Sequence, residues 1–133
     1  MAVPVLKRIL LVEDDPDIQE VTSLALTSLG GFAVKVCGSG PEAIAVAPRF
    51  RPHLILLDVM MPGMDGLTTL NALRANPDTA ASPVVFLTAK VQPHEIEEYK
   101  RAGAVDILVK PFEPSRLPER LNDIWSRLHD RAE

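Results

Sequence analysis

The sequence has one cysteine, no run of basic residues and no apolar stretch long enough to cross a membrane. Cys37 has no second cysteine to pair with, and its place at the end of an apolar run predicts a buried hydrophobic side chain rather than a reactive thiol. The formal net charge of -4 argues against direct nucleic-acid binding. We therefore expect a cytoplasmic protein that neither binds nucleic acid directly nor inserts into a membrane.

Glycine is missing from the segment after the first apolar run, where Glu13, Asp14 and Asp15 follow residues 9–12. The phosphate-binding loops of nucleotide-binding proteins need glycine at this position, and bare carboxylates repel phosphate. A nucleotide-binding loop of that kind is therefore excluded here.

Five short apolar runs alternate with helix-length segments. They predict strands at residues 6–12, 32–37, 53–57, 83–87 and 105–109. Continuous apolar runs of this length are typical of a parallel sheet that is buried on both faces. The 133 residues suit one α/β domain over residues 1–133, with its core at about 6–130 and no room for an output domain after Phe112.

Helices are predicted between the strands, at residues 16–29, 39–47, 67–75, 92–101 and 113–131. Pro16 opens the first helix and Gly30-Gly31 end it. The apolar residues at helical spacing between them are Ile18, Val21, Leu24, Ala25 and Leu29. Pro48 and Pro52 are expected to bracket a loop. The last helix carries the clearest apolar stripe, formed by Leu117, Leu121, Ile124, Trp125 and Leu128.

Chemically reactive side chains follow four of the predicted strands. They are Glu13, Asp14, Asp58, Thr88 and Lys110. The carboxyl ends of parallel strands meet at one edge of the sheet, so these side chains are expected to converge. Carboxylates about 5 Å apart repel each other by roughly 3 kcal/mol at an effective dielectric constant near 20. Raised pKa values, a divalent cation or a lysine must offset that repulsion.

Carboxylate oxygens are the ligands of hard cations, so this cluster predicts Mg²⁺ or Mn²⁺, with Lys110 as a further positive charge. The alternative is that the acids only cap helices, which would explain Asp14 or Asp15 but not Asp58. With a cation bound, a phosphoryl group is attracted, and an aspartate can attack phosphorus to form an acyl phosphate. The hydroxyl of Thr88 is then suited to donate to a phosphoryl oxygen.

Four segments carry a resemblance to the receiver domains of two-component response regulators, including single-domain, chemotaxis-regulator-like ones. They are Val12-Glu13-Asp14-Asp15, residues 56–66, Leu87-Thr88-Ala89-Lys90 and Val109-Lys110-Pro111-Phe112. The resemblance covers almost the whole chain. It implies a flavodoxin-like, doubly wound five-stranded parallel sheet with strand order 2-1-3-4-5 and helices on both faces.

The resemblance also implies a phosphoacceptor switch. A sensor histidine kinase or a phosphotransfer protein would pass a phosphoryl group from its phosphohistidine to Asp58. Mg²⁺, or Mn²⁺, would be held by Asp14, Asp58 and the backbone carbonyl of Met60, with Glu13 acting through water. The domain would be regulatory, with at most self-phosphorylation and autodephosphorylation chemistry of its own.

The same resemblance gives Thr88 and Lys110 the role of contacting the phosphoryl group, and implies a cis peptide bond between Lys110 and Pro111. It makes the face of the fourth helix, fifth strand and fifth helix the expected surface for an unknown downstream protein and the candidate dimer surface.

Three residues bear on how the switch would behave. Ile107 replaces the tyrosine or phenylalanine that the family usually places three residues before the lysine, so the usual aromatic readout is expected to be altered. Met60 and Lys90, two residues beyond Asp58 and Thr88, are expected to shield an acyl phosphate from water.

Two other functions remain as alternatives. A Mg²⁺-dependent phosphatase with an aspartyl nucleophile would need a second aspartate where Met60 stands. A receiver-like interaction module that never accepts phosphate is opposed by the complete set of acids, threonine and lysine, but Ile107 keeps it in consideration.

Overall fold

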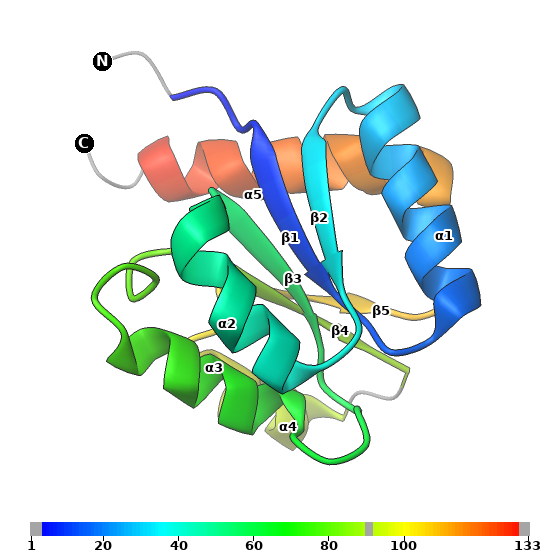
Figure 1. Cartoon of the computed structure of the whole chain (residues 1–133). Coiled ribbons are helices and arrows are strands. Elements are labelled where there is room, and N and C mark those ends of the chain that lie inside the picture. Colours follow the sequence, from blue (N-terminus) through cyan, green and yellow to red (C-terminus); the bar gives the residue numbers. More distant parts are fainter. Residues whose placement is uncertain (1–3, 90–91, 131–133) are drawn as a thin grey trace.

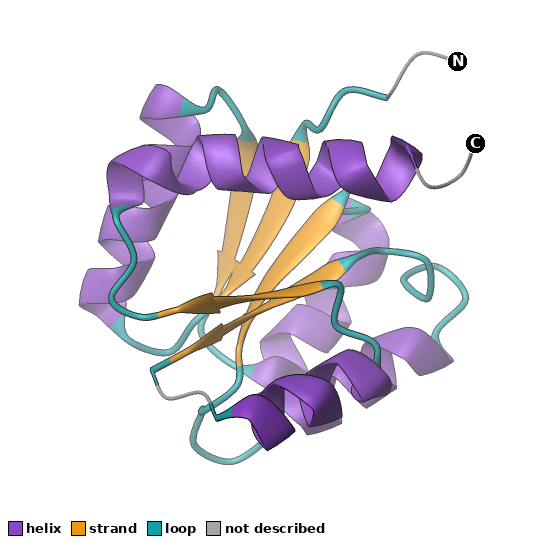
Figure 2. Cartoon of the chain, turned by 180° about the vertical axis from the view of Figure 1, so that it is seen from behind, coloured by secondary structure: helices purple, strands orange, loops and turns teal. Residues whose placement is uncertain are grey.

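The computed structural model describes residues 4–89 and 92–130. Five parallel strands form one sheet with helices on both faces (Figures 1 and 2). The strands are β1 (Arg8–Val12), β2 (Ala33–Cys37), β3 (Leu54–Asp58), β4 (Val84–Thr88) and β5 (Asp106–Val109). Their spatial order, β2-β1-β3-β4-β5, is the order that the resemblance implied. The predicted strands are confirmed, with ends that shift by one or two residues.

The helices form two layers. They are α1 (Pro16–Leu24), continued by the π-helix η1 (Ala25–Leu29), then α2 (Gly40–Phe50), α3 (Gly66–Ala75), α4 (Pro93–Ala102), the short 3₁₀ helix η2 (Pro114–Arg116) and α5 (Leu117–Asp130). In Figure 1, α1 and α5 cover one face of the sheet, and α2, α3 and α4 cover the other. The doubly wound architecture predicted from the sequence is therefore confirmed.

The sheet alternates its apolar side chains between two cores. Ile9 and Leu11 of β1 pack on the side of α5, whereas Leu10 and Val12 pack on the side of α2 and α3. All five residues of β3 and all five of β4 are buried, because helices cover both faces of these strands. Each such leucine or isoleucine contributes about 1.5–3 kcal/mol through burial. The ends of these strands are consequently held in place by packing, and side chains at the strand ends have well-defined positions.

The first helix buries only part of its predicted apolar face. Ala25 is buried as predicted, but Val21, Leu24 and Leu29 are 47%, 60% and 64% exposed, and Leu26 is buried instead. In α1 the buried residue is the polar Thr22, which the spacing of apolar residues does not mark. Beyond it comes the π-helical turn, in which the amide of Gly30 donates to the carbonyl of Ala25, five residues earlier, and the extra residue shifts the phase of the helix.

The prediction that Pro48 begins a loop is wrong, because α2 continues through it to Phe50. Proline removes one helical hydrogen bond, but Ala47 is buried and Phe50 packs against the core on either side of it. Tertiary packing therefore overrides the local preference. The helix ends at Arg51, whose left-handed backbone (φ 54°, ψ 62°) lets its amide donate to the carbonyl of Ala47.

Cys37 is buried, as expected from its place at the end of an apolar run. Burial, together with the nearby negative charge of Glu42, raises the pKa of the Cys37 thiol to about 11. The thiol is therefore protonated at neutral pH and has little reactivity.

Candidate functional site

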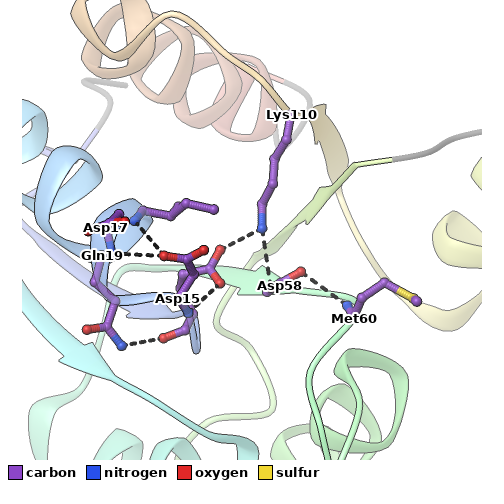
Figure 3. Close-up of polar contacts among 8 residues, drawn as sticks. Asp15, Asp17, Gln19, Asp58, Met60 and Lys110 are labelled. Atoms are coloured by element: carbon purple, nitrogen blue, oxygen red, sulfur yellow. Dashed lines mark hydrogen bonds and ion pairs between the residues drawn. The ribbon is translucent and has the colours of Figure 1, made fainter.

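Three strand ends bring two carboxylates and one ammonium group into contact. Glu13 follows β1, Asp58 ends β3 and Lys110 follows β5. Lys110 Nζ lies 2.6 Å from Glu13 Oε1 and 3.2 Å from Asp58 Oδ2. Figure 3 shows the Lys110 side chain reaching down to Asp58. Glu13 and Asp58 are only 1% and 3% exposed, so the lysine offsets charge that water does little to screen.

Asp14 adds a third carboxylate to this cluster, from the exposed side. One oxygen from each of Glu13, Asp14 and Asp58 lies within 4.8 Å of the others. The convergence of the three acids predicted from the sequence is therefore confirmed. An all-oxygen set of this kind suits a hard divalent cation, so the cluster is able to hold a metal ion.

Lys110 remains charged at this site. Burial lowers the pKa of Lys110, but the hydrogen bond to Glu13 and the negative charges of Asp58 and Glu13 more than compensate, and the pKa is raised overall. The site therefore has a permanent ammonium group beside the Asp58 carboxylate at neutral pH.

The backbone also fixes Asp58. The amide of Met60 donates to Asp58 Oδ1 at 3.1 Å, while the Met60 side chain is 74% exposed. Gly66, the first residue of α3, packs so closely that a Cβ there would lie 2.6 Å from the Asp58 carbonyl oxygen. The sequence places this glycine in the segment 56–66 that carries the resemblance, but gives it no role in the site because it lies in a polar turn cluster. It directly follows Asp65, which caps α3 through the amide of Thr68.

A separate set of bonds positions the segment after β1. The amide of Asp15 donates to Glu13 Oε2 at 3.1 Å, and the Asp15 carboxylate caps α1 through the amide of Asp17 (Figure 3). Gln19, a residue that sequence reasoning missed, donates from its side chain to the Glu13 carbonyl. Helix capping thus explains Asp15, but it does not explain Glu13 or Asp58, which contact Lys110.

Thr88 lies at the same edge of the sheet. It is buried at the end of β4, one residue beyond Leu87, which is paired with Asp58. Its carbonyl accepts the amide of Lys110 at 2.7 Å, and the peptide bond from Lys110 to Pro111 is cis, as the resemblance implied. Lys90, the second residue expected to shield the site, lies outside the described residues.

Comparison with known protein families matches residues 9–122 to the response regulator receiver domain. The chain belongs to the response regulator receiver-domain family. Receiver domains of this family are regulatory parts of two-component signalling, which agrees with a phosphoacceptor switch.

Curated relatives of this receiver domain include whole transcriptional regulators. The DNA-binding response regulator MtrA of Mycolicibacterium smegmatis is 38% identical over 93% of this chain and 53% of MtrA. The DNA-binding dual master transcriptional regulator RpaA of Synechocystis sp. is 36% identical over 90% of this chain and 49% of RpaA. The chain thus spans about half the length of these relatives.

Two solved receiver structures match the chain over nearly their whole length. Chemotaxis protein CheY4 of Vibrio cholerae has a TM-score of 0.84 and 32% identity, covering 90% of this chain and 99% of CheY4. The receiver domain of sensor histidine kinase PA1611 from Pseudomonas aeruginosa, with a magnesium ion coordinated in its active-site cleft, has a TM-score of 0.80 and 34% identity over 92% of this chain and 99% of that domain. Across residues 4–89 and 92–130, no helix has the length and apolar character needed to span a bilayer.

Proposed function

We propose that Asp58 is the phosphoacceptor of a two-component signalling switch. The donor is the phosphohistidine of a sensor histidine kinase or of a phosphotransfer protein. The observation that carries this proposal is the contact between Lys110 and the buried Asp58 carboxylate at the carboxyl edge of the sheet, beside Glu13 and Asp14. The amide of Met60 holds the Asp58 carboxylate in one orientation, and the exposed Asp14 carboxylate lies close to it.

In the proposed reaction an Asp58 carboxylate oxygen attacks phosphorus. The bond between phosphorus and the donor's imidazole nitrogen breaks, its electron pair stays on that nitrogen, and the nitrogen takes up a proton. Lys110 stays protonated and neutralises charge on the transferred group, because its pKa is raised. Thr88, buried at the end of β4, is proposed to donate its hydroxyl to a phosphoryl oxygen.

Glu13, Asp14, Asp58 and the Met60 carbonyl are proposed to hold Mg²⁺, or Mn²⁺, with Glu13 acting through water. The cation would offset the charge of the carboxylates and of the incoming phosphoryl group. The all-oxygen cluster supports this assignment. The same residues would also support slow self-phosphorylation by small phosphodonors and slow autodephosphorylation.

The donor protein is proposed to dock on the exposed apolar side of α1. Val21 and Ile18 line a cavity of about 430 Å³ that also includes Ala89, Lys110 and Phe112, so apolar surface adjoins the phosphoacceptor site. Leu24 and Leu29 extend this surface along α1 and η1. A donor seated there would have its phosphohistidine next to Asp58.

Output is proposed to pass through the face formed by α4, β5 and α5. Residues 1–133 are proposed to form one receiver domain that acts in the cytoplasm. A phosphoryl group adds close to two negative charges and must favour one of two conformations by a few kcal/mol to act as a switch. The same face is the proposed dimer surface.

A phosphate-independent interaction module is the second candidate, and Ile107 is the observation that favours it. Ile107 is half-buried on β5, packs against the core and is paired with Phe86 of β4. It has neither the ring nor the hydroxyl of the usual residue, so the aromatic readout of a phosphoryl signal is missing on β5. Whether Asp58 accepts a phosphoryl group decides between the two candidates.

The test is the intact mass of the protein after incubation with acetyl phosphate and Mg²⁺. The expected result is one phosphoryl adduct on the natural protein, none on Asp58→Asn, and none when EDTA removes the metal. Asp65→Asn, which changes an exposed capping acid outside the site, is the matched control and should still form the adduct.

The complete absence of an adduct would contradict the proposal if beryllium fluoride also failed to bind. Beryllium fluoride mimics the phosphoryl group without hydrolysis, so its binding would separate a short-lived acyl phosphate from a module that never accepts phosphate.

A further inference from the structure

Five cations gather around the amino end of β1, the edge strand β2 and the end of α2. They are Lys7, Arg8, Lys35, Arg49 and Arg51, which we call the cationic edge. None of the five forms an ion pair with a carboxylate in the described part of the chain, where the ion pairs found involve other lysines and arginines. In a protein with a net charge of -4, this is a concentration of positive charge that no carboxylate of the described residues pairs with.

Contacts bring the cationic edge together. Arg8 Nε donates to the carbonyl of Arg51 at 2.8 Å, which ties β1 to the end of α2. Lys35 and Arg49 line a cavity of about 370 Å³ together with Val46 and Phe50. The cavity therefore has apolar walls with a cation on β2 and another on α2. It suits a ligand that carries both apolar and anionic groups.

The backbone conformation of Arg51 is unfavourable for a residue that has a side chain. Its φ of 54° lies in the left-handed region, where glycine usually ends a helix. A residue with a Cβ is disfavoured in this conformation by about 1–2 kcal/mol. An arginine at this position keeps a positive charge beside Arg8 that a glycine would not supply.

Strand β2 also offers unpaired backbone groups. The amide of Ala33 donates to Lys7, and the carbonyl of Cys37 accepts from Glu13, so these residues direct their polar groups toward β1. Backbone groups alternate along a strand, and Val34 and Val36 therefore direct theirs away from β1. In the described residues no strand pairs with that side of β2.

We propose that the cationic edge binds an extended acidic segment of a partner protein, which adds to the sheet as a strand beside β2. Backbone hydrogen bonds to Val34 and Val36 would supply affinity, and acidic side chains facing Lys35 and Arg49 would supply specificity. An apolar side chain of the segment would enter the cavity beside Phe50. Duplex DNA is a poorer fit, because affinity for its phosphates comes from lysine and arginine contacts along the backbone, and this protein has a net charge of -4.

The binding test uses a fluorescent peptide that alternates glutamate with valine and tyrosine, followed by fluorescence anisotropy. The double variant Lys35→Glu/Arg49→Glu should weaken binding by at least about tenfold through charge repulsion. Arg51→Gly should weaken it about threefold without lowering the urea midpoint, since glycine relieves the left-handed strain. That variant separates lost binding from lost folding.

Three controls give the result its meaning. Arg101→Glu, at an exposed arginine of α4 outside the cationic edge, should bind the peptide as the natural protein does. Asp58→Asn should also bind it equally, because the cationic edge is independent of the phosphoacceptor. A peptide with lysine in place of glutamate should not bind.

Hydrogen exchange followed by NMR tests the added strand. The peptide should slow exchange of the Val34 and Val36 amides, whereas the Ala33 amide, which is already bonded, should change little. Failure of the peptide to bind, or binding without protection of these two amides, would overturn the proposal. Equal binding of a DNA duplex that depends on Lys35 and Arg49, or self-association through the same residues, would overturn it in favour of those occupants.

Discussion

Lys110 contacts two buried carboxylates, and its replacement tests how the acidic cluster is stabilised. Lys110→Met removes charged hydrogen bonds to Glu13 and Asp58, so in EDTA the free energy of unfolding should fall by about 2–3 kcal/mol. Excess Mg²⁺ should recover more stability in the variant than in the natural protein, because the cation replaces the missing positive charge. Urea unfolding with and without Mg²⁺ measures both effects.

Lys100→Met, at an exposed position of α4, is the control and should unfold like the natural protein. The pKa of Lys110 is raised, so its contribution should be complete below the unfolded value of about 10.4 and lost as pH rises through the folded value. Equal stability of Lys110→Met and the natural protein in EDTA at pH 7 would contradict this account.

Met60 tests how water reaches the phosphorylated site. Its exposed thioether lies two residues beyond Asp58 and is unable to orient a water molecule strongly. Met60→Asn places an amide there, and the acyl phosphate should hydrolyse several-fold faster. The decay of the phosphoryl adduct after removal of acetyl phosphate gives the rate; Met64→Asn, in the next turn, should leave it unchanged. An unaltered decay in Met60→Asn would remove the shielding role of this side chain.

At the scale of elements, the exposed apolar side of α1 predicts a difference between protein and small-molecule phosphodonors. Leu24→Lys should slow phosphoryl transfer from a histidine kinase about tenfold by placing a charge in an apolar contact. Transfer from acetyl phosphate should not change, because Leu24 lies at the end of α1, outside the acidic cluster, and takes no part in the reaction at Asp58. Val5→Lys, at an equally exposed apolar residue of the N-terminal segment, should slow neither donor. Equal slowing of both donors in Leu24→Lys would show damage to the fold instead of to docking.

Replacement of the proline inside helix α2 is expected to stabilise the protein. Pro48 removes a hydrogen bond within this helix, so Pro48→Ala should raise the free energy of unfolding by about 1–3 kcal/mol. Pro118→Ala is the matched control: this proline stands in the first turn of α5, where no helical hydrogen bond is lost, and its replacement should give little gain. Thermal unfolding of the two variants makes the comparison, and a gain of the same size in both would contradict this explanation.

The elements also show where sequence reasoning succeeds and where it stops. β3 and β4 were predictable because burial on both faces demands continuous apolar residues. The stripe of α5 was predictable because the helix is regular. The buried face of α1 was not, since its buried residue is the polar Thr22, and the π turn that follows changes the phase without a local signal in the residues. The course of α2 through Pro48 depends on contacts of Phe50 that are distant in sequence.

For the whole molecule, the candidate site was predictable as a meeting of strand ends. Parallel topology alone brings Glu13, Asp58 and Lys110 to one edge. Their individual contacts were not predictable, because the reach of Lys110 to both acids depends on side-chain conformations. The close approach of Gly66 to Asp58 depends on how α3 packs against the end of β3.

His53 joins three distant parts of the chain. Its Nδ1 accepts the amides of Lys7 and Arg8 at 3.2 and 3.0 Å, and its ring packs edge-on against Trp125 of α5. Trp125 in turn donates to the carbonyl of Pro4 at 2.6 Å. The N-terminal segment, the start of β3 and α5 are therefore linked through one imidazole that must stay unprotonated at Nδ1.

This link predicts how stability depends on pH. Burial lowers the pKa of His53, and the positive charges of Arg8 and Lys7 lower it further. The unfolded chain therefore binds the proton more readily, so the contribution is complete above the unfolded value of about 6.5 and is lost as pH falls toward the folded value. His53→Gln, whose side-chain oxygen still accepts a hydrogen bond, should show a smaller loss of stability between about pH 6.5 and 5 in urea unfolding. His94→Gln, at an exposed histidine of α4, should keep the steeper slope of the natural protein; the same slope in all three proteins would show that His53 does not couple folding to pH.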